Sequence, residues 1–366
     1  MLAPAELIAP PLPGALLALQ AFTPEPLAGA LGIGVAEARK IIAAVHRGAS
    51  LQATKGLTGV TRGAMAAART RGHVPSLEVR AVRPSAVDPF VKLALATADG
   101  HVIEAVRIPL EREGRFSACV SSQAGCALAC AFCATGRLGL ARNLEVWEIV
   151  EQVRLLRATL EPEKRQRIHG VVFQGMGEPL ANVDRVVAAI RVMCEPSALA
   201  IDARAITVCT SGLPSGIRLL ARELPKVRLG ISIASARPSV RRSLMPIDAA
   251  HPLESVLEAV EEHARATGLA PMWAVTPLAG VNDTREDAAA LAALSRRFEE
   301  RAGIRPRLSV VPYNAIDAGP GDPFRRGDVT TFLDHLAAQG LKPHVRYSGG
   351  GDVGAACGQL AGERAL

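Results

Sequence analysis

Aromatic residues are scarce in this chain of 366 residues, because Phe, Tyr and Trp together make up only 3% of it. Base stacking on aromatic side chains therefore cannot dominate any contact with a nucleic acid. Long apolar runs are missing too, and none reaches the roughly 18 residues that a membrane-spanning helix needs. The apolar stretch 12–22 lacks the positive charge that begins a signal peptide, since no Lys or Arg precedes Arg39. We expect a soluble, cytoplasmic protein with no membrane partner.

Two common catalytic motifs are also absent: the sequence has neither a Walker-type phosphate loop nor a His-Glu-x-x-His zinc motif. The seven cysteines, an odd number and mostly clustered, do not fit the disulfide framework of a secreted protein. Apolar residues are ample, at 49% of the chain, enough for one large domain and a small one. The net charge of +7 suits a polyanionic partner such as RNA but does not by itself establish one.

The stretch 119–142 carries the most specific motif. Cys126, Cys130 and Cys133 have the spacing Cys-x3-Cys-x2-Cys. Three clustered thiolates are one ligand short of a closed zinc or four-cysteine iron–sulfur site, which leaves one metal position open to a substrate. Two other interpretations stay open here. The same spacing places three buried thiols on one helix face, and Cys119 or a histidine could complete a structural zinc site. Glycines that bracket the run favour a loop.

From residue 116 onward, strand-like and helix-like segments alternate. The strand-like runs are 116–121, 168–174, 205–210, 227–235, 272–278 and 307–313. The amphipathic stretches that follow them are 144–160, 183–194, 215–223, 238–244 with 253–267, 285–301 and 329–339. Six such units predict a parallel sheet with right-handed crossovers, two units short of an eight-stranded barrel. We expect an α/β fold with a partial (β/α)6 TIM-like barrel.

Four regions are predicted along the chain. They are a helical accessory domain (1–75), a β-hairpin extension (76–111), the core barrel (112–345) and a C-terminal segment (346–366) that carries Cys357. The accessory domain has helix-like spacing at 35–46 and 63–71. Its arginines at 62, 69 and 71 could form a solvated helix face or an RNA contact.

The hairpin has strands at 90–97 and 102–109 around the turn Ala98-Asp-Gly100. Glu104 lies in its second strand, where a lone exposed Glu usually has no special role.

Functional residues of such barrels lie at the carboxyl ends of the strands. Five motifs fall at those ends: the cysteine motif, Gly175-Met-Gly-Glu178, Thr210-Ser211-Gly212, the run 232–235 and Pro312-Tyr-Asn314. Because all five motifs lie at the same end of the strands, they predict a single site. Glu178 could accept a hydrogen bond from a ligand ammonium, and the alternative is a tight strand-to-helix turn.

These residues resemble a radical S-adenosylmethionine (SAM) family. It is the adenine C2 methyltransferases of large-subunit (23S) ribosomal RNA and tRNA, with relatives that methylate C8 of the same rRNA adenine. The matching stretches are Cys119-Val-Ser-Ser-Gln-Ala-Gly-Cys126, Arg142-Asn-Leu144, Gly175-Met-Gly-Glu-Pro179, Thr210-Ser-Gly212, Gly280-Val-Asn-Asp283 and Ala355-Ala-Cys-Gly-Gln-Leu-Ala-Gly362. The last stretch is the most specific, because ordinary radical SAM proteins lack it.

The resemblance implies one [4Fe-4S] cluster on Cys126, Cys130 and Cys133, and two SAM molecules per turnover. Cys357 resembles the cysteine that is methylated first, Cys119 the thiol that resolves the protein–RNA adduct, and Glu104 a proton acceptor. The residues that match SAM-binding positions are Gly177, Glu178, Cys209, Ser211, Ser232, Ile233, Ala234 and Asn314. The implied partners are rRNA, with tRNA as a further candidate, and a reductase or flavodoxin-type electron donor, with the protein acting as a monomer.

The sequence departs from the family at several positions. Ser232-Ile-Ala234 stands where the family has Ser-Leu-His, Tyr313-Asn314-Ala315 where it has Trp-Asn-Pro, and Gly349 to Gly351 where it commonly has Arg-Gly. Cys209 is often Ser. The resemblance implies that these positions belong to the surface that faces SAM or RNA, so a different target, such as C8 or another RNA position, stays an alternative. A zinc-binding RNA protein without catalytic activity is the other.

Overall fold

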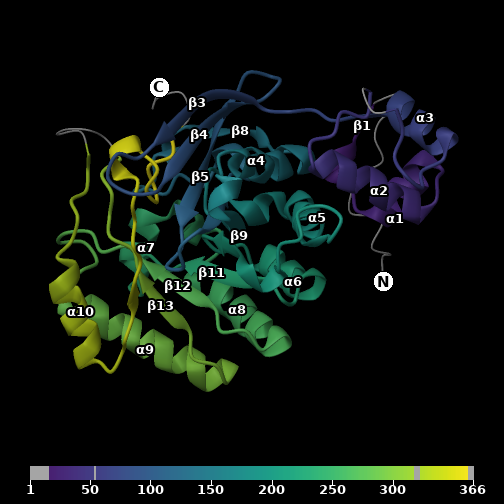
Figure 1. Cartoon of the computed structure of the whole chain (residues 1–366). Coiled ribbons are helices and arrows are strands. Elements are labelled where there is room, and N and C mark those ends of the chain that lie inside the picture. The colour runs from purple at the N-terminus through teal and green to yellow at the C-terminus, as the bar shows by residue number, and fades with distance from the viewer. Residues whose placement is uncertain (1–15, 53–54, 317–321, 362–366) are drawn as a thin grey trace.

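The computed structural model describes residues 16–52, 55–316 and 322–361, and a ten-stranded sheet forms its centre (Figure 1). The sheet has the order β14-β13-β12-β11-β10-β9-β6-β5-β4-β3. Its parallel part consists of β6 (Arg115–Val120), β9 (Arg167–Phe173), β10 (Ile206–Thr210), β11 (Arg228–Ser232), β12 (Met272–Val275), β13 (Arg307–Val310) and β14 (His344–Val345). The predicted partial barrel is confirmed. The two-residue β14 is an addition that the sequence did not indicate.

Helices on the outside of the sheet connect the parallel strands. They are α4 (Val146–Ala158), α5 (Val183–Cys194), α6 (Pro214–Glu223), α7 (Pro238–Leu244), α8 (Leu253–Thr267), α9 (Arg285–Ala302) and α10 (Val329–Ala338). Local signals set their ends. In α9, Thr284 accepts a hydrogen bond from the Asp287 N–H at the start, and Gly303 closes the end with a φ of 71°. These helices lie close to their predicted positions.

An antiparallel extension continues the sheet beyond β6. It consists of β3 (Glu78–Pro84), β4 (Val91–Ala96) and β5 (Val102–Pro109), which pairs with β6. The hairpin β4–β5 was predicted, whereas β3 was not. A separate ribbon of β7 (Gln123–Cys126) and β8 (Gly139–Asn143) was also missed, because glycine-rich strands give a weak pattern.

The N-terminal helices pack around a small hydrophobic core of their own. This region contains α1 (Pro24–Leu31), α2 (Val35–His46) and α3 (Arg62–Arg71), with the two-residue strands β1 (Leu17–Ala18) and β2 (Gly72–His73). Helix α1 was not predicted. In the arginine cluster, Arg69 donates to the Leu51 carbonyl and Arg71 to the Ala30 carbonyl. The domain boundary at residue 75 stays a prediction, and residues 1–15 of that region lie outside the described residues.

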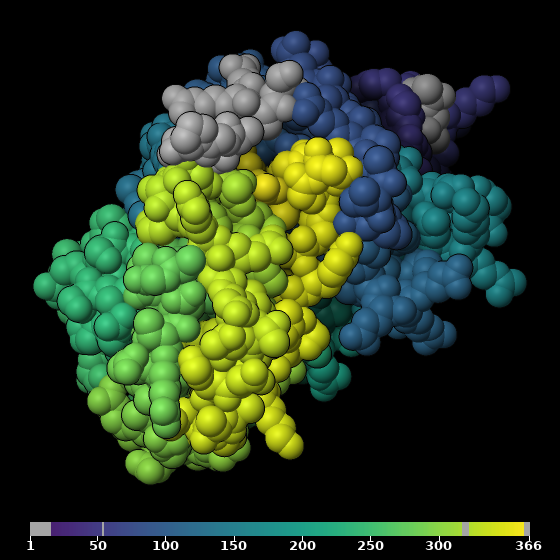
Figure 2. All heavy atoms as spheres, turned by 90° about the vertical axis from the view of Figure 1, so that its left-hand side faces the viewer, coloured from purple at the N-terminus to yellow at the C-terminus, as the bar shows by residue number. Residues whose placement is uncertain are grey.

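The C-terminal segment fills the space between the antiparallel extension and the last units of the barrel (Figure 2). Short 3-10 helices complete the fold at Leu19–Ala21, Thr135–Arg137, Pro162–Lys164, Pro179–Asn182, Ala203–Ala205, Pro246–Ala249 and Gly351–Val353. No helix within the described residues has the length and apolar character needed to cross a membrane.

Two buried histidines should make the stability of the fold depend on pH. Burial lowers the pKa of His263 on α8 to about 4 and that of His46 on α2 to about 3. When the pH falls below about 6.5, the ordinary pKa of histidine, these two side chains take up protons in the unfolded chain. In the folded chain they stay neutral until the pH reaches their lowered pKa values. The free energy of unfolding should therefore fall as the pH drops from about 6.5 towards 4.

The ring nitrogens of His263 are buried without hydrogen-bond partners, so an apolar replacement is tolerable there. We expect His263→Leu to flatten the pH dependence of urea unfolding, whereas His73→Leu, at an exposed position, should leave it unchanged. An unchanged profile for His263→Leu would show that another group sets the acid sensitivity.

Candidate active site

A cavity opens at the carboxyl ends of the parallel strands, where the sequence placed the site. The predicted residues that line it are Cys130, Cys133, Ser211, Ser232, Ala234, Asn314 and Cys357. The predicted residues that do not line it are Glu104, Cys119, Cys126, Gly177, Glu178, Cys209 and Ile233. The structure therefore brings two cysteines of the motif and the distant Cys357 into one chamber.

The cysteine motif forms a loop. Cys126 is the last residue of β7, and Cys130 and Cys133 follow in turns, all three half-buried. The interpretation as three thiols on a helix face is therefore wrong. Gly136 allows the loop to close on itself, because a Cβ there would approach the Cys130 backbone nitrogen to 3.0 Å.

The chemistry of this loop fits an iron–sulfur cluster. Burial, together with the negative charge of Cys133, raises the pKa of Cys126 to about 11 and that of Cys130 to about 12. A bound metal reverses this effect by holding coordinating thiols in their deprotonated form. Within the described residues, no three His, Cys, Asp or Glu side chains are arranged so that they could hold a single metal ion. In a four-iron cluster, by contrast, each thiolate binds its own iron.

The C-terminal segment is fastened to the cysteine loop beside Cys357. The Ala134 N–H donates to the Gly358 carbonyl at 2.8 Å, and the Asn314 amide donates to the Cys357 carbonyl at 3.2 Å. Gly358 has a φ of 87°, and a Cβ at this position would lie 3.2 Å from the Phe132 carbonyl oxygen. These contacts place the Cys357 thiol at the cavity wall next to the cysteine loop.

Glu178 is buried below the cavity floor and holds two turns together. One carboxylate oxygen accepts from the Leu180 N–H and the other from the Ser211 N–H, each at 2.9 Å. Burial raises the pKa of Glu178, and these two hydrogen bonds oppose that shift. Gly177 precedes it with a φ of 95°, where a side chain would collide with Gln123. The carboxylate thus positions Ser211, which lines the cavity.

Arg241 on α7 is a positioning residue that the sequence analysis missed. Its guanidinium is fully buried and donates to the carbonyls of Ser232, Ile233 and Ser211 at 2.6–2.9 Å. Asp248 balances its charge at 3.0 Å. This arginine therefore joins the ends of β10 and β11. The only available signal was an Arg-Arg pair in an amphipathic helix, which is typical of surfaces.

Glu104 is buried, which corrects the expectation of an exposed side chain. It forms an ion pair with Lys92 at 2.9 Å, and both side chains are 1% exposed. Glu104 also accepts from the Ala361 N–H at 2.8 Å, and Lys92 donates to the Gly354 carbonyl at 3.2 Å. The pair therefore fastens the C-terminal segment at points on both sides of Cys357.

The thiols of Cys119 and Cys209 and the guanidinium of Arg346 lie close to Cys357, which lines the cavity. Burial and, to a smaller extent, the negative charge of Cys357 raise the pKa of Cys119 to about 12, and the Arg346 guanidinium opposes this shift. Burial likewise raises the pKa of Cys209 to about 11, and Arg346 again opposes the shift. Arg346 is held by a hydrogen bond to Gln174 at 2.5 Å. Cys119 and Cys357, distant in sequence, are thus near enough for charge on Cys357 to affect the pKa of Cys119.

The glycine run before Cys357 is packed tightly at two of its three positions. A Cβ at Gly349 would approach the Asp88 carboxylate to 2.4 Å, and one at Gly350 would approach Ala355 to 2.8 Å. Asp88 also accepts from the Gly350 N–H at 2.8 Å. Here the glycines allow close packing, so the Arg-Gly of the resembled family has no room in this arrangement.

Comparisons with known proteins agree with this geometry. Residues 120–294 match the family model of the Radical SAM superfamily. The chain is 60% identical to a probable RNA methyltransferase of Sorangium cellulosum, over 92% of this chain and 90% of that relative. It is 41% identical to a dual-specificity RNA methyltransferase RlmN of Syntrophobacter fumaroxidans, over 77% and 79% respectively. A crystal structure of a radical SAM methyltransferase from Sphaerobacter thermophilus matches with a TM-score of 0.83 and 32% identity, over 95% of this chain and 100% of that one.

Proposed function

Because this chain belongs to the RlmN-like RNA methyltransferases of the radical SAM superfamily, we propose that it transfers a methyl-derived carbon to C2 of an adenine in 23S ribosomal RNA. A tRNA is a further proposed substrate, and the description of one relative as dual-specificity supports two RNA substrates. The observation that carries the proposal is the shared cavity of Cys130, Cys133 and Cys357.

Enzymes of this superfamily use a [4Fe-4S] cluster and SAM. Cys126, Cys130 and Cys133 would hold the cluster, which supplies the electron that cleaves SAM into a hydrogen-abstracting radical. Ser211 and Ser232 line the cavity in which SAM would bind. Glu178 holds the backbone of Ser211, and Arg241 holds the backbone of Ser232.

The proposed steps on the protein begin at Cys357. Its sulfur accepts a methyl group from a first SAM by displacement, and a second SAM supplies the radical that takes a hydrogen atom from this methyl group. The resulting carbon radical bonds to adenine C2. A radical is needed because the adenine carbon is a poor nucleophile and does not attack a methyl sulfonium.

Release requires the second thiol. The adduct would return one electron to the oxidised cluster that Cys126, Cys130 and Cys133 would hold, and it would give up its C2 proton, for which Glu104 is the proposed acceptor. The Cys119 sulfur then attacks the Cys357 sulfur, the bond between that sulfur and the transferred carbon breaks, and the carbon takes up a proton. A Cys119–Cys357 disulfide remains. The proximity of these two free thiols supports this step.

Mass analysis of rRNA and tRNA treated with the reconstituted enzyme and isotopically labelled SAM tests the target. The proposal expects label on C2 of adenine. Label on C8 or on another nucleotide would support the alternative target. That alternative draws on Ala234, which occupies the cavity wall where the resembled family has a histidine.

Changing any one of Cys126, Cys130 or Cys133 to Ala should abolish the cluster and SAM cleavage. Two thiolates cannot replace the three-cysteine motif, because each thiolate binds a separate iron. Iron and sulfide analysis and 5′-deoxyadenosine release measure the two effects. Cys194→Ala, on α5, is the matched control and should keep both. Normal cluster absorption in a motif variant would reject the assignment.

Glu178→Gln distinguishes a ligand contact from a positioning role. If Glu178 also accepts from the SAM ammonium, the variant loses a charge-assisted hydrogen bond of about 1.5–3 kcal/mol. SAM affinity should then fall by about 10- to 100-fold, as equilibrium dialysis of the reconstituted protein would show. Unchanged SAM affinity together with lower stability would limit Glu178 to the two backbone hydrogen bonds.

A further inference from the structure

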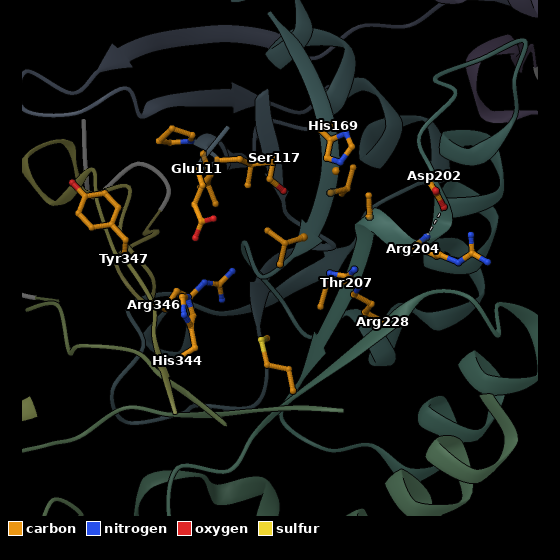
Figure 3. A pocket seen from close by; sticks show the side chains of 18 of the residues that line it. Glu111, Ser117, His169, Asp202, Arg204, Thr207, Arg228, His344, Arg346 and Tyr347 are labelled. Atoms are coloured by element: carbon orange, nitrogen blue, oxygen red, sulfur yellow. Dashed lines mark hydrogen bonds between the residues drawn. The ribbon is translucent and has the colours of Figure 1, made fainter. Parts of the chain in front are cut away.

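A second, larger cavity lies at the opposite end of the barrel, where the parallel strands begin (Figure 3). Its volume is about 770 Å³, within the range of small-molecule sites. In Figure 3, Glu111 and Arg346 lie on one side of it, and Thr207 and Arg228 lie on the other. Of its lining residues, only Arg346 was described above, as the arginine beside Cys119, Cys209 and Cys357.

Arginine occurs repeatedly at this end of the sheet. It is the first residue of β6, β9 and β11, as Arg115, Arg167 and Arg228, and Arg204 lies just before β10. Arg115 and Arg167 are register partners on adjacent strands. Like charges that stand directly opposite each other in a sheet are destabilising, so this arrangement has a cost for folding alone.

These four arginines have no carboxylate partner within the described ranges, in contrast to the arginines on the outer helices. Arg218, for example, pairs with Glu262 at 2.6 Å, and Arg297 pairs with Glu254 at 2.6 Å. At the cavity, Asp202 accepts from the backbone N–H of Arg204, which is a local turn contact. The positive charge there is therefore not neutralised by salt bridges.

Neighbouring groups confirm that positive charge gathers here. Burial lowers the pKa of His169, a lining residue, and the charges of Arg115 and Arg167 lower it further, against a smaller opposing effect of Asp202. The second lining carboxylate, Glu111, is exposed and forms no salt bridge within the described residues. A polyanion would relieve the repulsion among the arginines.

We propose that this cavity binds phosphate groups, with Arg204 and Arg228 as its principal ligands. Arginine matches phosphate oxygens in two-point hydrogen bonds, and the exposed guanidinium groups are accessible from solvent. The phosphates come from the RNA substrate, in which case the inference rests on the proposed function, or from a free nucleotide. Both sources share the same chemistry.

The test compares the full-length reconstituted protein with Arg204→Gln/Arg228→Gln. The control is Arg285→Gln/Arg296→Gln, an equal charge change on exposed residues of α9. Affinity for an unmodified tRNA transcript and for a 23S rRNA fragment is measured against salt concentration. Each lost phosphate contact reduces the magnitude of the slope of log K against log salt by about 0.7–0.9, so the loss of two contacts in the double variant should reduce it by about 1.4–1.8. The control should keep the wild-type slope.

A parallel arm uses AMP and inorganic phosphate as probes in thermal unfolding. A rise in melting temperature with AMP that is lost in Arg204→Gln/Arg228→Gln, with unchanged RNA slopes, would identify a free nucleotide as the source and keep the site. This arm stands even if the RNA substrate is wrong, because it involves neither RNA nor methyl transfer. Wild-type RNA slopes together with wild-type AMP and phosphate responses in the double variant would overturn the proposal.

Discussion

Cys357→Ala is expected to transfer no methyl group to RNA and to carry none on the protein after incubation with labelled SAM. The thiol is the proposed methyl acceptor, and it lines the cavity with Cys130 and Cys133 of the three-cysteine motif. The cluster itself should assemble, because Cys357 is not part of the three-cysteine motif. The expected loss is therefore complete for transfer and absent for iron content.

Scintillation counting of protein and RNA, alongside iron analysis, measures these quantities. Cys194→Ala serves as the control for removal of a half-buried thiol elsewhere and should retain transfer. Labelled RNA from Cys357→Ala would show that the carbon reaches adenine without a protein carrier.

Lys92→Met is expected to give the largest loss of stability. Lys92 and Glu104 are both 1% exposed, and the substitution removes the charge that pairs with a buried carboxylate. Breaking such a pair by removing one partner costs about 3–5 kcal/mol. The C-terminal segment should also loosen, since Glu104 accepts from Ala361 and Lys92 donates to Gly354.

Urea unfolding gives the stability, and limited proteolysis of the C-terminal segment reports the local effect. Lys92→Met/Glu104→Gln should recover much of the lost stability, because a neutral amide can still accept from Ala361 without an unpaired charge. The exposed Lys226→Met is the control. A loss below about 1 kcal/mol for Lys92→Met would show that the pair does not hold this region.

Much of the barrel was predictable because each parallel strand is a short apolar run followed by an amphipathic helix. The cysteine spacing and the residues at the strand ends predicted a site at the carboxyl ends of the strands, where the structure has the cavity lined by Cys130, Cys133 and Cys357. The two-residue β14 has too few residues for any period, and β3 carries mostly exposed side chains on an edge. Neither strand gives a pattern that a single sequence can reveal.

The missed features of the site depend on contacts between distant parts of the chain. Glu104 is buried, and it accepts a hydrogen bond from Ala361 in the C-terminal segment, more than 250 residues later. Arg241 has the sequence pattern of a surface residue, and its three carbonyl partners come from the ends of two strands. The sequence gives no sign that Gly349 is tightly packed, whereas its neighbours Asp88 and Phe90 leave no space for a side chain. Tertiary packing decides each of these cases.

The central claim is that Cys357 carries the methyl group and Cys119 releases it, and the protein–RNA adduct tests it most directly. Cys119→Ala protein, incubated with SAM, reductant and substrate RNA, is run on a denaturing gel with and without nuclease. The account predicts a protein–RNA band that nuclease removes, and Cys119→Ala/Cys357→Ala should not form it. If Cys119→Ala releases methylated RNA with no trapped band, the methyl-carrier mechanism is contradicted for this protein.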